Sequence, residues 1–194
     1  MAEDQNSNRA DHPTGTERVA EAVEKLALAD DDLVLNVQGD EPDVPVGALD
    51  RLVEAMGSDG NTCSIGTLAA PFDDDGPTSG PGSPLDPNCV KVVMDATGRA
   101  LYFSRSAIPF DRDREGAVDR PSRWLRHLGV YAFRVGTLRS ITGGRLPRSE
   151  LEEAESLEQL RWLEHGFGIS VITVERAFAG IDTPDDYAAF VKRV

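Results

Sequence analysis

Strand and helix patterns alternate between residues 33 and 69, and this order restricts the possible folds more than any other feature of the chain. Residues 33–37 read Leu-Val-Leu-Asn-Val, a short apolar run typical of a buried strand. Apolar side chains then recur at helical spacing from Leu49 to Met56, and residues 62–69 have the pattern of a second strand. A strand, a helix and a strand in succession predict an α/β fold with a parallel sheet.

The remaining patterns continue this alternation to the end of the chain. Thr14 and Glu17 form a capping-box pattern, so a first helix should begin near Thr14. The glycine- and proline-rich residues 73–88 predict a flexible surface loop. The other expected elements are a hairpin of strands 90–94 and 100–103 around the turn 95–98, a strand at 128–133, a helix at about 149–165 that begins with a Ser149–Glu152 capping box, a strand at 169–174, and a last helix from about 183.

Composition narrows the partners that this chain can have. Its 194 residues suit one domain, which we expect at 11–194 after a disordered tail at 1–10. With 34 acidic and 20 basic residues the net charge is -14, which argues against binding to nucleic acid or to an anionic membrane. A phosphate-bearing substrate would therefore need metal ions and a few well-placed arginines. No apolar run is long enough to span a bilayer and the polar start lacks a secretion signal, which predicts a cytoplasmic protein.

The two cysteines, Cys63 and Cys89, lie in predicted strands. Two isolated cysteines give no zinc-binding spacing, and we expect small buried apolar side chains rather than a disulfide.

Two aspartates that follow strand patterns are candidate metal ligands. Asp40 comes just after the strand at 33–37, where open α/β sheets bind ligands, but it also suits a turn aspartate beside Gly39. Asp182 precedes the last predicted helix and also suits a helix cap. If the fold brings them together, their oxygens could hold Mg²⁺.

A carboxylate in the 149–165 helix pattern is a second kind of candidate. Glu158 is seven residues after Leu151, so both should share one helix face, and a carboxylate on an apolar face is costly to bury without a partner. A ligand-binding role fits the pattern as well as the alternatives, which are a position at the rim of the apolar face or a structural salt bridge. Gln159 beside it is less constrained.

Three side chains at strand ends complete the candidates. Arg105 follows the strand at 100–103 and could pair bidentately with a carboxylate, or it could simply be exposed. His127 precedes a strand, and taken alone such a histidine is more often structural than catalytic. Tyr131 is four residues further on, so it should point to the same side of the strand as His127.

Six segments resemble, in order, the motifs of the 3-deoxy-manno-octulosonate (Kdo) cytidylyltransferases. They are Asp-His-Pro-Thr-Gly-Thr-Glu-Arg at 11–18, Asn-Val-Gln-Gly-Asp-Glu-Pro at 36–42, Leu-Tyr-Phe-Ser-Arg-Ser-Ala-Ile-Pro-Phe at 101–110, Arg-His-Leu-Gly-Val-Tyr at 126–131, Glu-Ser-Leu-Glu-Gln-Leu-Arg at 155–161 and Ile-Asp-Thr-Pro-Asp-Asp at 181–186. The resemblance implies a mostly parallel, Rossmann-like nucleotide-binding sheet of the nucleotide-diphospho-sugar transferase type, with an antiparallel excursion between about 90 and 133. It also implies a homodimer.

The resemblance further implies an activity and a role for each candidate. The reaction would join CTP and Kdo to give CMP-Kdo and pyrophosphate, for lipopolysaccharide synthesis. The segment Thr14, Gly15 and Thr16 would contact the cytosine and ribose, and Asp40 and Asp182 would hold the Mg²⁺ that activates the sugar hydroxyl. The sugar acid would lie against Gln38, Arg105, His127, Tyr131, Glu158 and Gln159.

Two departures from the family pattern bear on activity. Thr14 stands where the family usually has serine, a change that keeps the hydroxyl. The sequence contains no glycine-rich, lysine-bearing loop of the kind that wraps a triphosphate, and the two βα units expected before residue 11 are missing. We therefore expect the domain to be incomplete at its N-terminus and the chain as written to have almost no transferase activity. The alternatives are a cytidylyltransferase for another acidic sugar and a non-catalytic remnant that pairs with a partner subunit.

Overall fold

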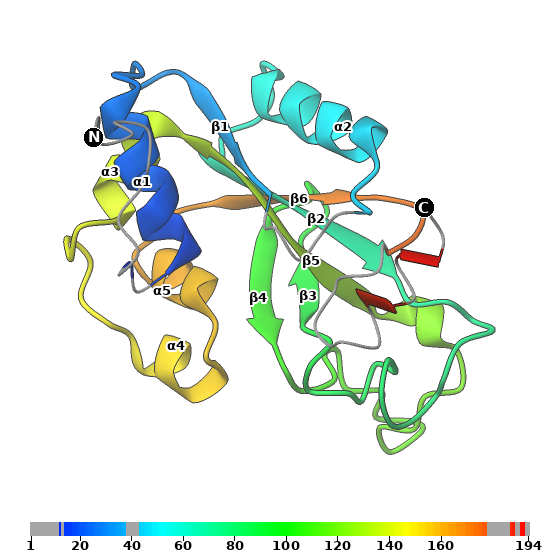
Figure 1. The fold of residues 1–194 in the computed structure, drawn as a ribbon. Helices are drawn as coiled ribbons and strands as arrows, with labels where there is room; N and C mark the ends of the chain where they lie inside the picture. Colours follow the sequence, from blue (N-terminus) through cyan, green and yellow to red (C-terminus); the bar gives the residue numbers. More distant parts are fainter. Residues whose placement is uncertain (1–11, 13, 38–42, 178–186, 189–190, 193–194) are drawn as a thin grey trace.

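The computed structural model describes residues 12, 14–37, 43–177, 187–188 and 191–192 (Figure 1). Its strands are β1 (Leu33–Asn36), β2 (Ile65–Pro71), β3 (Lys91–Met94), β4 (Ala100–Ser104), β5 (Leu125–Arg134) and β6 (Ile169–Thr173). Its helices are α1 (Gly15–Lys25), α2 (Val46–Gly57), α3 (Val135–Ile141), α4 (Glu150–Glu155) and α5 (Glu158–Glu164), with a 3-10 turn at Pro121–Arg123. In this part of the chain, no helix is both long and apolar enough to cross a membrane.

The sheet corrects the expectation of a mostly parallel arrangement. Its strand order is β4-β3-β5-β2-β6, with β1 also paired to β5. Among the described strands only β2 and β6 pair in parallel, whereas β5 is antiparallel to β1, β2 and β3, and β3 is antiparallel to β4. The fold is α/β, but the sheet is mixed and mostly antiparallel.

The position of β5 explains this difference. The order β1-α2-β2 does make β1 and β2 run in the same direction, because both are antiparallel to β5. They are not hydrogen-bonded neighbours, however, because β5 lies between them. The apolar rhythm specifies the direction of consecutive strands, but it does not specify which later strand is inserted between them.

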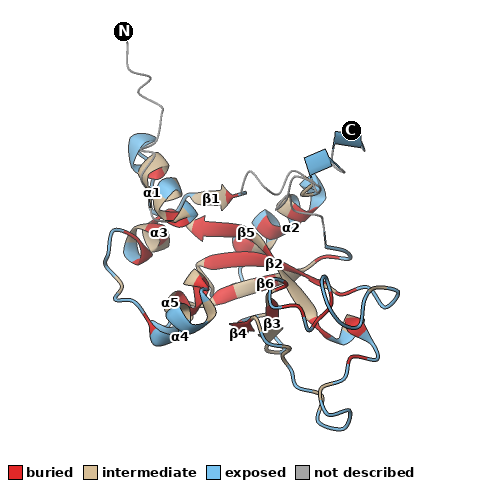
Figure 2. Ribbon diagram, turned by 60° about the horizontal axis from the view of Figure 1, so that its bottom comes forward, coloured by how far each residue is buried: buried red, intermediate tan, exposed pale blue. Residues whose placement is uncertain are grey.

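Helices cover both faces of the sheet (Figures 1 and 2). The buried side chains form two main cores. Along β2 the side chains alternate, so that Ile65 and Ala69 join one core while Leu68 and Ala70 join the other. On one face, α2 contributes Ala48, Leu52 and Met56, and on the other α1, α3 and α5 contribute Val23, Leu138, Ile141, Leu160 and Trp162. Because both faces are covered, β2 is buried from Ile65 to Ala70, as its continuous apolar pattern requires.

The predicted helix starts are confirmed at two capping residues. The Thr14 side chain accepts a hydrogen bond from the Glu17 backbone N–H at 3.2 Å, and α1 begins at Gly15. In the same way, Ser149 accepts from the Glu152 N–H at 2.9 Å, and α4 begins at Glu150.

The single long helix expected at about 149–165 is wrong. Ser156 adopts a left-handed conformation, with φ at 51°, and separates α4 from α5. The break places Leu157 in the core (7% exposed) while Leu151 stays exposed (41%). Glu158 therefore does not share a continuous helix face with Leu151, because the two residues lie on different helices.

Other differences are local. The strands of the 91–104 hairpin and β6 lie where the sequence predicts them, but β5 is longer than expected, and α3 was not expected. Cys63 and Cys89 are free, but each precedes a strand instead of lying in one; Cys89 is buried and Cys63 is partly exposed. The last predicted helix falls largely outside the described residues.

Candidate active site

The site lies along one edge of β5, in the gap between the stretch that pairs with β3 and the stretch that pairs with β1. Since β2 pairs with β5 along one edge, β1 and β3 must share the other edge. There β3 pairs at Leu125 and Arg126, whereas β1 pairs only from Tyr131 onward. The stretch between these pairings carries His127 and leads to Tyr131. Ligands of α/β sheets commonly bind where neighbouring strands diverge in this way.

A bulge in β5 shapes this stretch. Thr67 of β2 is opposite Tyr131, but the next β2 residue, Leu68, is opposite Leu128, so β5 has two extra residues at this point. An even number of extra residues leaves the alternation unchanged, and the rings of His127 and Tyr131 lie on one side with centroids 5.4 Å apart. The predicted shared face of these two residues is confirmed.

Thr67 fixes the histidine. Its Oγ1 lies 2.8 Å from the Val130 carbonyl oxygen and 2.9 Å from His127 Nε2. A hydroxyl has one proton, so a Thr67 that donates to the carbonyl must accept from a protonated Nε2. This arrangement favours the tautomer of His127 in which Nδ1 is left as an acceptor.

His127 is neutral at physiological pH. Its ring packs against Phe103 and Tyr131, with centroid distances of 5.0 and 5.4 Å, although the residue as a whole keeps some exposure. Burial of the ring lowers the pKa of His127 to about 3, because charging the imidazole in these surroundings is unfavourable. His127 is therefore suited to hydrogen bonding and not to binding an anion through a positive charge.

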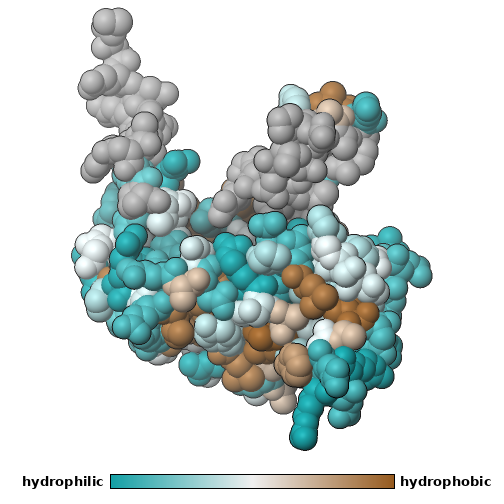
Figure 3. All heavy atoms as spheres, turned by 90° about the horizontal axis from the view of Figure 1, so that it is seen from below, coloured by the Kyte–Doolittle hydropathy of each residue, from teal (hydrophilic) through white to brown (hydrophobic). Residues whose placement is uncertain are grey.

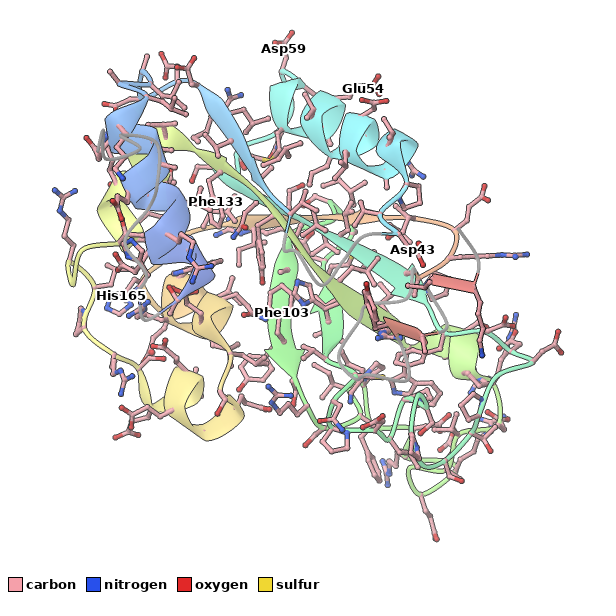
Figure 4. All side chains as sticks on the ribbon, in the orientation of Figure 1. Asp43, Glu54, Asp59, Phe103, Phe133 and His165 are labelled. Atoms are coloured by element: carbon pink, nitrogen blue, oxygen red, sulfur yellow. The ribbon has the colours of Figure 1, made fainter. Side chains whose placement is uncertain are left out.

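Tyr131 presents a polar atom without a partner. The residue is 7% exposed and packs against Phe133 and Trp162, with ring centroids 5.7 and 5.4 Å away. Phe103 and Phe133, at opposite ends of this aromatic row, are labelled in Figure 4. The Tyr131 hydroxyl is buried and has no hydrogen-bond partner among the described residues. Burial raises the pKa of Tyr131, and the nearby charge of Glu158 raises it further, so this hydroxyl stays protonated and can donate.

Glu158 joins α5 to the start of α1. Thr16 Oγ1 donates to its carboxylate at 2.7 Å and Thr14 Oγ1 approaches it at 3.4 Å. Arg161 Nη2 donates to the same carboxylate at 3.1 Å. Burial raises the pKa of Glu158, while the Thr16 hydroxyl and the Arg161 guanidinium offset part of that rise. A cavity of about 380 Å³ adjoins this carboxylate, with Thr14 and Glu158 in its lining.

Arg105 is held by backbone carbonyl groups. Its Nε donates to the Glu155 carbonyl at 2.7 Å, Nη1 to the Pro87 carbonyl at 3.0 Å, and Nη2 approaches the Ser156 carbonyl at 3.4 Å. A guanidinium has five N–H donors, so two remain for another acceptor. Ser156 is two residues from Glu158 along the chain, so the contact with Ser156 connects Arg105 to the segment that carries Glu158.

Several of the predicted site residues contact one another in the structure, whereas others lie outside the described residues. Hydrogen bonds and ring contacts connect Thr14, Thr16 and Glu158, and separately His127 and Tyr131; Gln159 is buried in α5 and Gly15 begins α1. Gln38, Asp40 and Asp182 lie outside the described residues, so their positions stay predictions. Within the described residues, no group of three or more His, Cys, Asp or Glu side chains could hold a metal ion.

Two residues that shape the site, Thr67 and Glu155, were not predicted from the sequence. Thr67 lies within an apolar strand pattern, and only the β5 bulge gives its hydroxyl a function. Glu155 is part of a motif at 155–161, but its role depends on Arg105, which is 50 residues away in sequence and therefore undetectable from spacing.

Tyr131 lies opposite Asn36, the last residue of β1, so the site adjoins the carboxyl end of that strand, where open α/β sheets bind ligands. A family profile described as "Cytidylyltransferase" matches residues 6–173. The 3-deoxy-manno-octulosonate cytidylyltransferase of Halorhodospira halophila is 44% identical over 189 residues, which cover 95% of this chain and 70% of that protein. Its counterpart in Syntrophobacter fumaroxidans is 47% identical over 183 residues, which cover 94% of this chain and 68% of that protein.

A solved structure is also similar. It is CMP:2-keto-3-deoxy-manno-octonic acid synthetase complexed with CTP, with a TM-score of 0.79 and 34% identity, covering 96% of this chain and 72% of that one. The chain therefore belongs to the cytidylyltransferase family, in its 3-deoxy-manno-octulosonate branch.

Proposed function

We propose that the chain is a Kdo cytidylyltransferase, which transfers CMP from CTP to Kdo and releases pyrophosphate. The observation that carries this proposal is the hydrogen bond from Thr16 to Glu158. It joins the segment expected to bind the nucleotide to the helix expected to bind the sugar acid, so one site can serve both substrates. The relatives described above, which carry this name and are 44% and 47% identical in sequence, support the same activity.

The nucleotide would bind at the start of α1. Thr14, Gly15 and Thr16 form the cap and first turn of an 11-residue helix, where backbone N–H groups lack partners within the helix. These groups and the two hydroxyls can hydrogen-bond the cytosine and ribose. The similar solved structure, which is complexed with CTP, supports this assignment by family resemblance.

The sugar acid would bind between Arg105 and β5. The two unused N–H donors of Arg105 suit a carboxylate, and the unpartnered hydroxyl of Tyr131 suits a sugar oxygen. Glu158 can accept from sugar hydroxyls, and neutral His127 can serve as a further polar contact. Gln38 and Gln159 complete the proposed set. The requirement for a carboxylate distinguishes Kdo from a neutral sugar.

Mg²⁺ would be held by Asp40 and Asp182, whose carboxylate oxygens are the ligands that this ion prefers. When bound, Mg²⁺ supplies positive charge that offsets the charge of the triphosphate. The chain's own side chains orient the sugar so that its anomeric hydroxyl faces the α-phosphorus. Catalysis then depends mainly on positioning and on neutralising charge.

A turnover assay and a binding assay together test the proposal. Release of pyrophosphate from CTP that depends on Kdo and Mg²⁺ supports the enzyme. Binding of Kdo without turnover supports the non-catalytic alternative. The absence of both Kdo binding and turnover would contradict the proposal. Faster turnover with another acidic sugar than with Kdo would identify that sugar as the substrate.

The expected homodimer stays a prediction. Figure 3 shows apolar patches among hydrophilic side chains on the face seen from below. Exposed large apolar side chains of the described residues include Leu85, Leu101 and Phe110. Sedimentation of the purified chain measures the oligomeric state directly.

A further inference from the structure

Lys91 of β3 is a fully buried cation whose hydrogen bonds go to backbone carbonyl groups. It is 0% exposed, and its Nζ donates to the carbonyl oxygens of Asp86 at 2.8 Å and of Arg105 at 2.6 Å. Among the described residues, no carboxylate lies within ion-pair distance of it. Burial lowers the pKa of Lys91, because the interior disfavours its charge. Burying an ammonium group to hydrogen-bond two neutral carbonyls costs free energy, which suggests that Lys91 has a role beyond packing.

Both carbonyl groups that accept hydrogen bonds from Lys91 help to fix the position of Arg105. One is the carbonyl of Arg105 itself. The other is that of Asp86, whose peptide neighbour Pro87 accepts the Nη1–H of Arg105 at 3.0 Å. Lys91 therefore fixes the backbone of the arginine and, at the same time, the loop that holds its guanidinium.

This loop is itself ordered by a carboxylate. Asp86 accepts the Gly82 N–H at 2.7 Å and the Asn88 N–H at 2.8 Å. These bonds lower the pKa of Asp86 and keep it ionised. The segment at 73–88, expected to be a flexible loop, thus contains a well-anchored turn where it meets Arg105.

Glu155 also holds Arg105. Its carboxylate accepts from Ser104 Oγ at 2.6 Å and from the Arg105 backbone N–H at 2.8 Å. Its carbonyl accepts the Nε–H of Arg105 at 2.7 Å. One residue thus binds both the main chain and the side chain of the arginine.

We infer that Lys91 and Glu155 are positioning residues that clamp Arg105 and aim its two free N–H donors at the carboxylate of an acidic sugar. The inference rests on the proposed function for its ligand but not for its geometry. A guanidinium held by three carbonyls has lost its rotamer freedom before the ligand arrives, which preserves affinity. Lys91 and Glu155 act through Arg105 and need not touch the ligand.

The geometry is tested without any ligand. In ¹⁵N-labelled protein the Arg105 Nε–H should give a resolved resonance that exchanges slowly with water, assigned by its loss in Arg105→Lys. Lys91→Met and Glu155→Gln should each broaden it or accelerate its exchange. The Nε–H of Arg139, which donates to Glu24 elsewhere, is the internal reference. An unchanged Arg105 resonance in both variants overturns the inference.

Ligand binding supplies the second test. Calorimetry should show that Lys91→Met lowers the affinity for Kdo on the order of tenfold to a hundredfold, which is about the loss expected when a binding group is misplaced. The affinity for CTP should stay within about twofold of wild type. In Lys91→Met/Arg105→Ala, binding should be no weaker than in Arg105→Ala alone. Lys25→Met, which removes an exposed lysine paired with Glu21, is the matched control.

The outcomes separate this inference from the proposed function. If Arg105→Ala leaves Kdo binding unchanged, the proposed role of Arg105 fails, and the exchange data alone decide the clamp. If Arg105→Ala weakens Kdo but Lys91→Met does not, or if the two effects add fully, the clamp is wrong and the proposed function stands. Should Lys91→Met not fold, Asp86→Ala loosens the same turn and is held to the same criteria.

Discussion

The hydrogen bond between Thr16 and Glu158 can be tested by removing one hydroxyl. Thr16→Val keeps the shape of the side chain and deletes the donor that lies 2.7 Å from the carboxylate. Thr16 is 5% exposed, so water cannot easily replace it. Hydrogen bonds to charged groups contribute about 1.5–3 kcal/mol, and we expect the free energy of unfolding to fall by about 2 kcal/mol near neutral pH.

The loss should depend on pH in a defined direction. The Thr16 hydroxyl lowers the pKa of Glu158, so its removal raises a pKa that burial has already raised. A carboxyl with a raised folded-state pKa stabilises the protein when protonated, and this stabilisation is lost as the pH rises through that pKa. The deficit of Thr16→Val should therefore be largest at neutral pH and should shrink in mildly acidic buffer.

Urea unfolding followed by tryptophan fluorescence measures both effects. Thr97→Val is the matched control, because its hydroxyl also donates to a carboxylate, that of Asp95 at 2.6 Å, but in an exposed turn. Surface changes of this kind usually stay within about 0.5 kcal/mol. Equal losses in the two variants, or a loss in Thr16→Val that does not change with pH, would refute the reasoning.

Three further predictions follow from the described contacts. Tyr131→Phe removes a buried hydroxyl without a partner among the described residues and should raise the free energy of unfolding by about 1 kcal/mol. It should also weaken the binding of Kdo, and a loss of stability in urea would contradict the prediction. With its pKa lowered to about 3 from 6.5, His127 should show no NMR titration near neutrality, and its stabilisation should be present above about pH 6.5 and lost as the pH falls toward about 3; a titration midpoint near 6.5 would count against its burial. A Cβ on Gly66 would lie 2.7 Å from the sulfur of Met56, so Gly66→Ala should cost about 1–3 kcal/mol by urea unfolding, whereas Gly47→Ala, with open space around it, should be neutral or stabilising.

Local chemistry made much of the fold predictable. The caps Thr14 and Ser149 and the hairpin at 91–104 depend on neighbouring residues, and the structure confirms them. The strand arrangement was not predictable in this way, because the insertion of β5 between β1 and β2 depends on residues far apart in sequence. The break at Ser156 was missed because a single left-handed residue leaves the helical rhythm on either side intact.

The site was predictable only in part, for the same reason. The motifs at 11–18, 126–131 and 155–161 predicted a set of site residues, and the structure shows contacts among several of them. Their mutual contacts, such as Thr16 with Glu158, span 142 residues and required the fold. The support of Arg105 by the buried Lys91 was hidden within an ordinary strand pattern, where a lysine suggests an exposed position.

The claim that this chain binds an acidic sugar at Arg105 and β5 is tested most directly by a calorimetric titration of the purified protein. Kdo and its carboxylate methyl ester are compared under the same conditions, in the wild type and in Arg105→Ala. We predict that the wild type binds Kdo and that it binds the ester at least tenfold more weakly, since a charged bidentate pair is worth about 1.5–3 kcal/mol. Arg105→Ala should remove this difference. Equal binding of acid and ester by the wild type, or no binding of either, would contradict it.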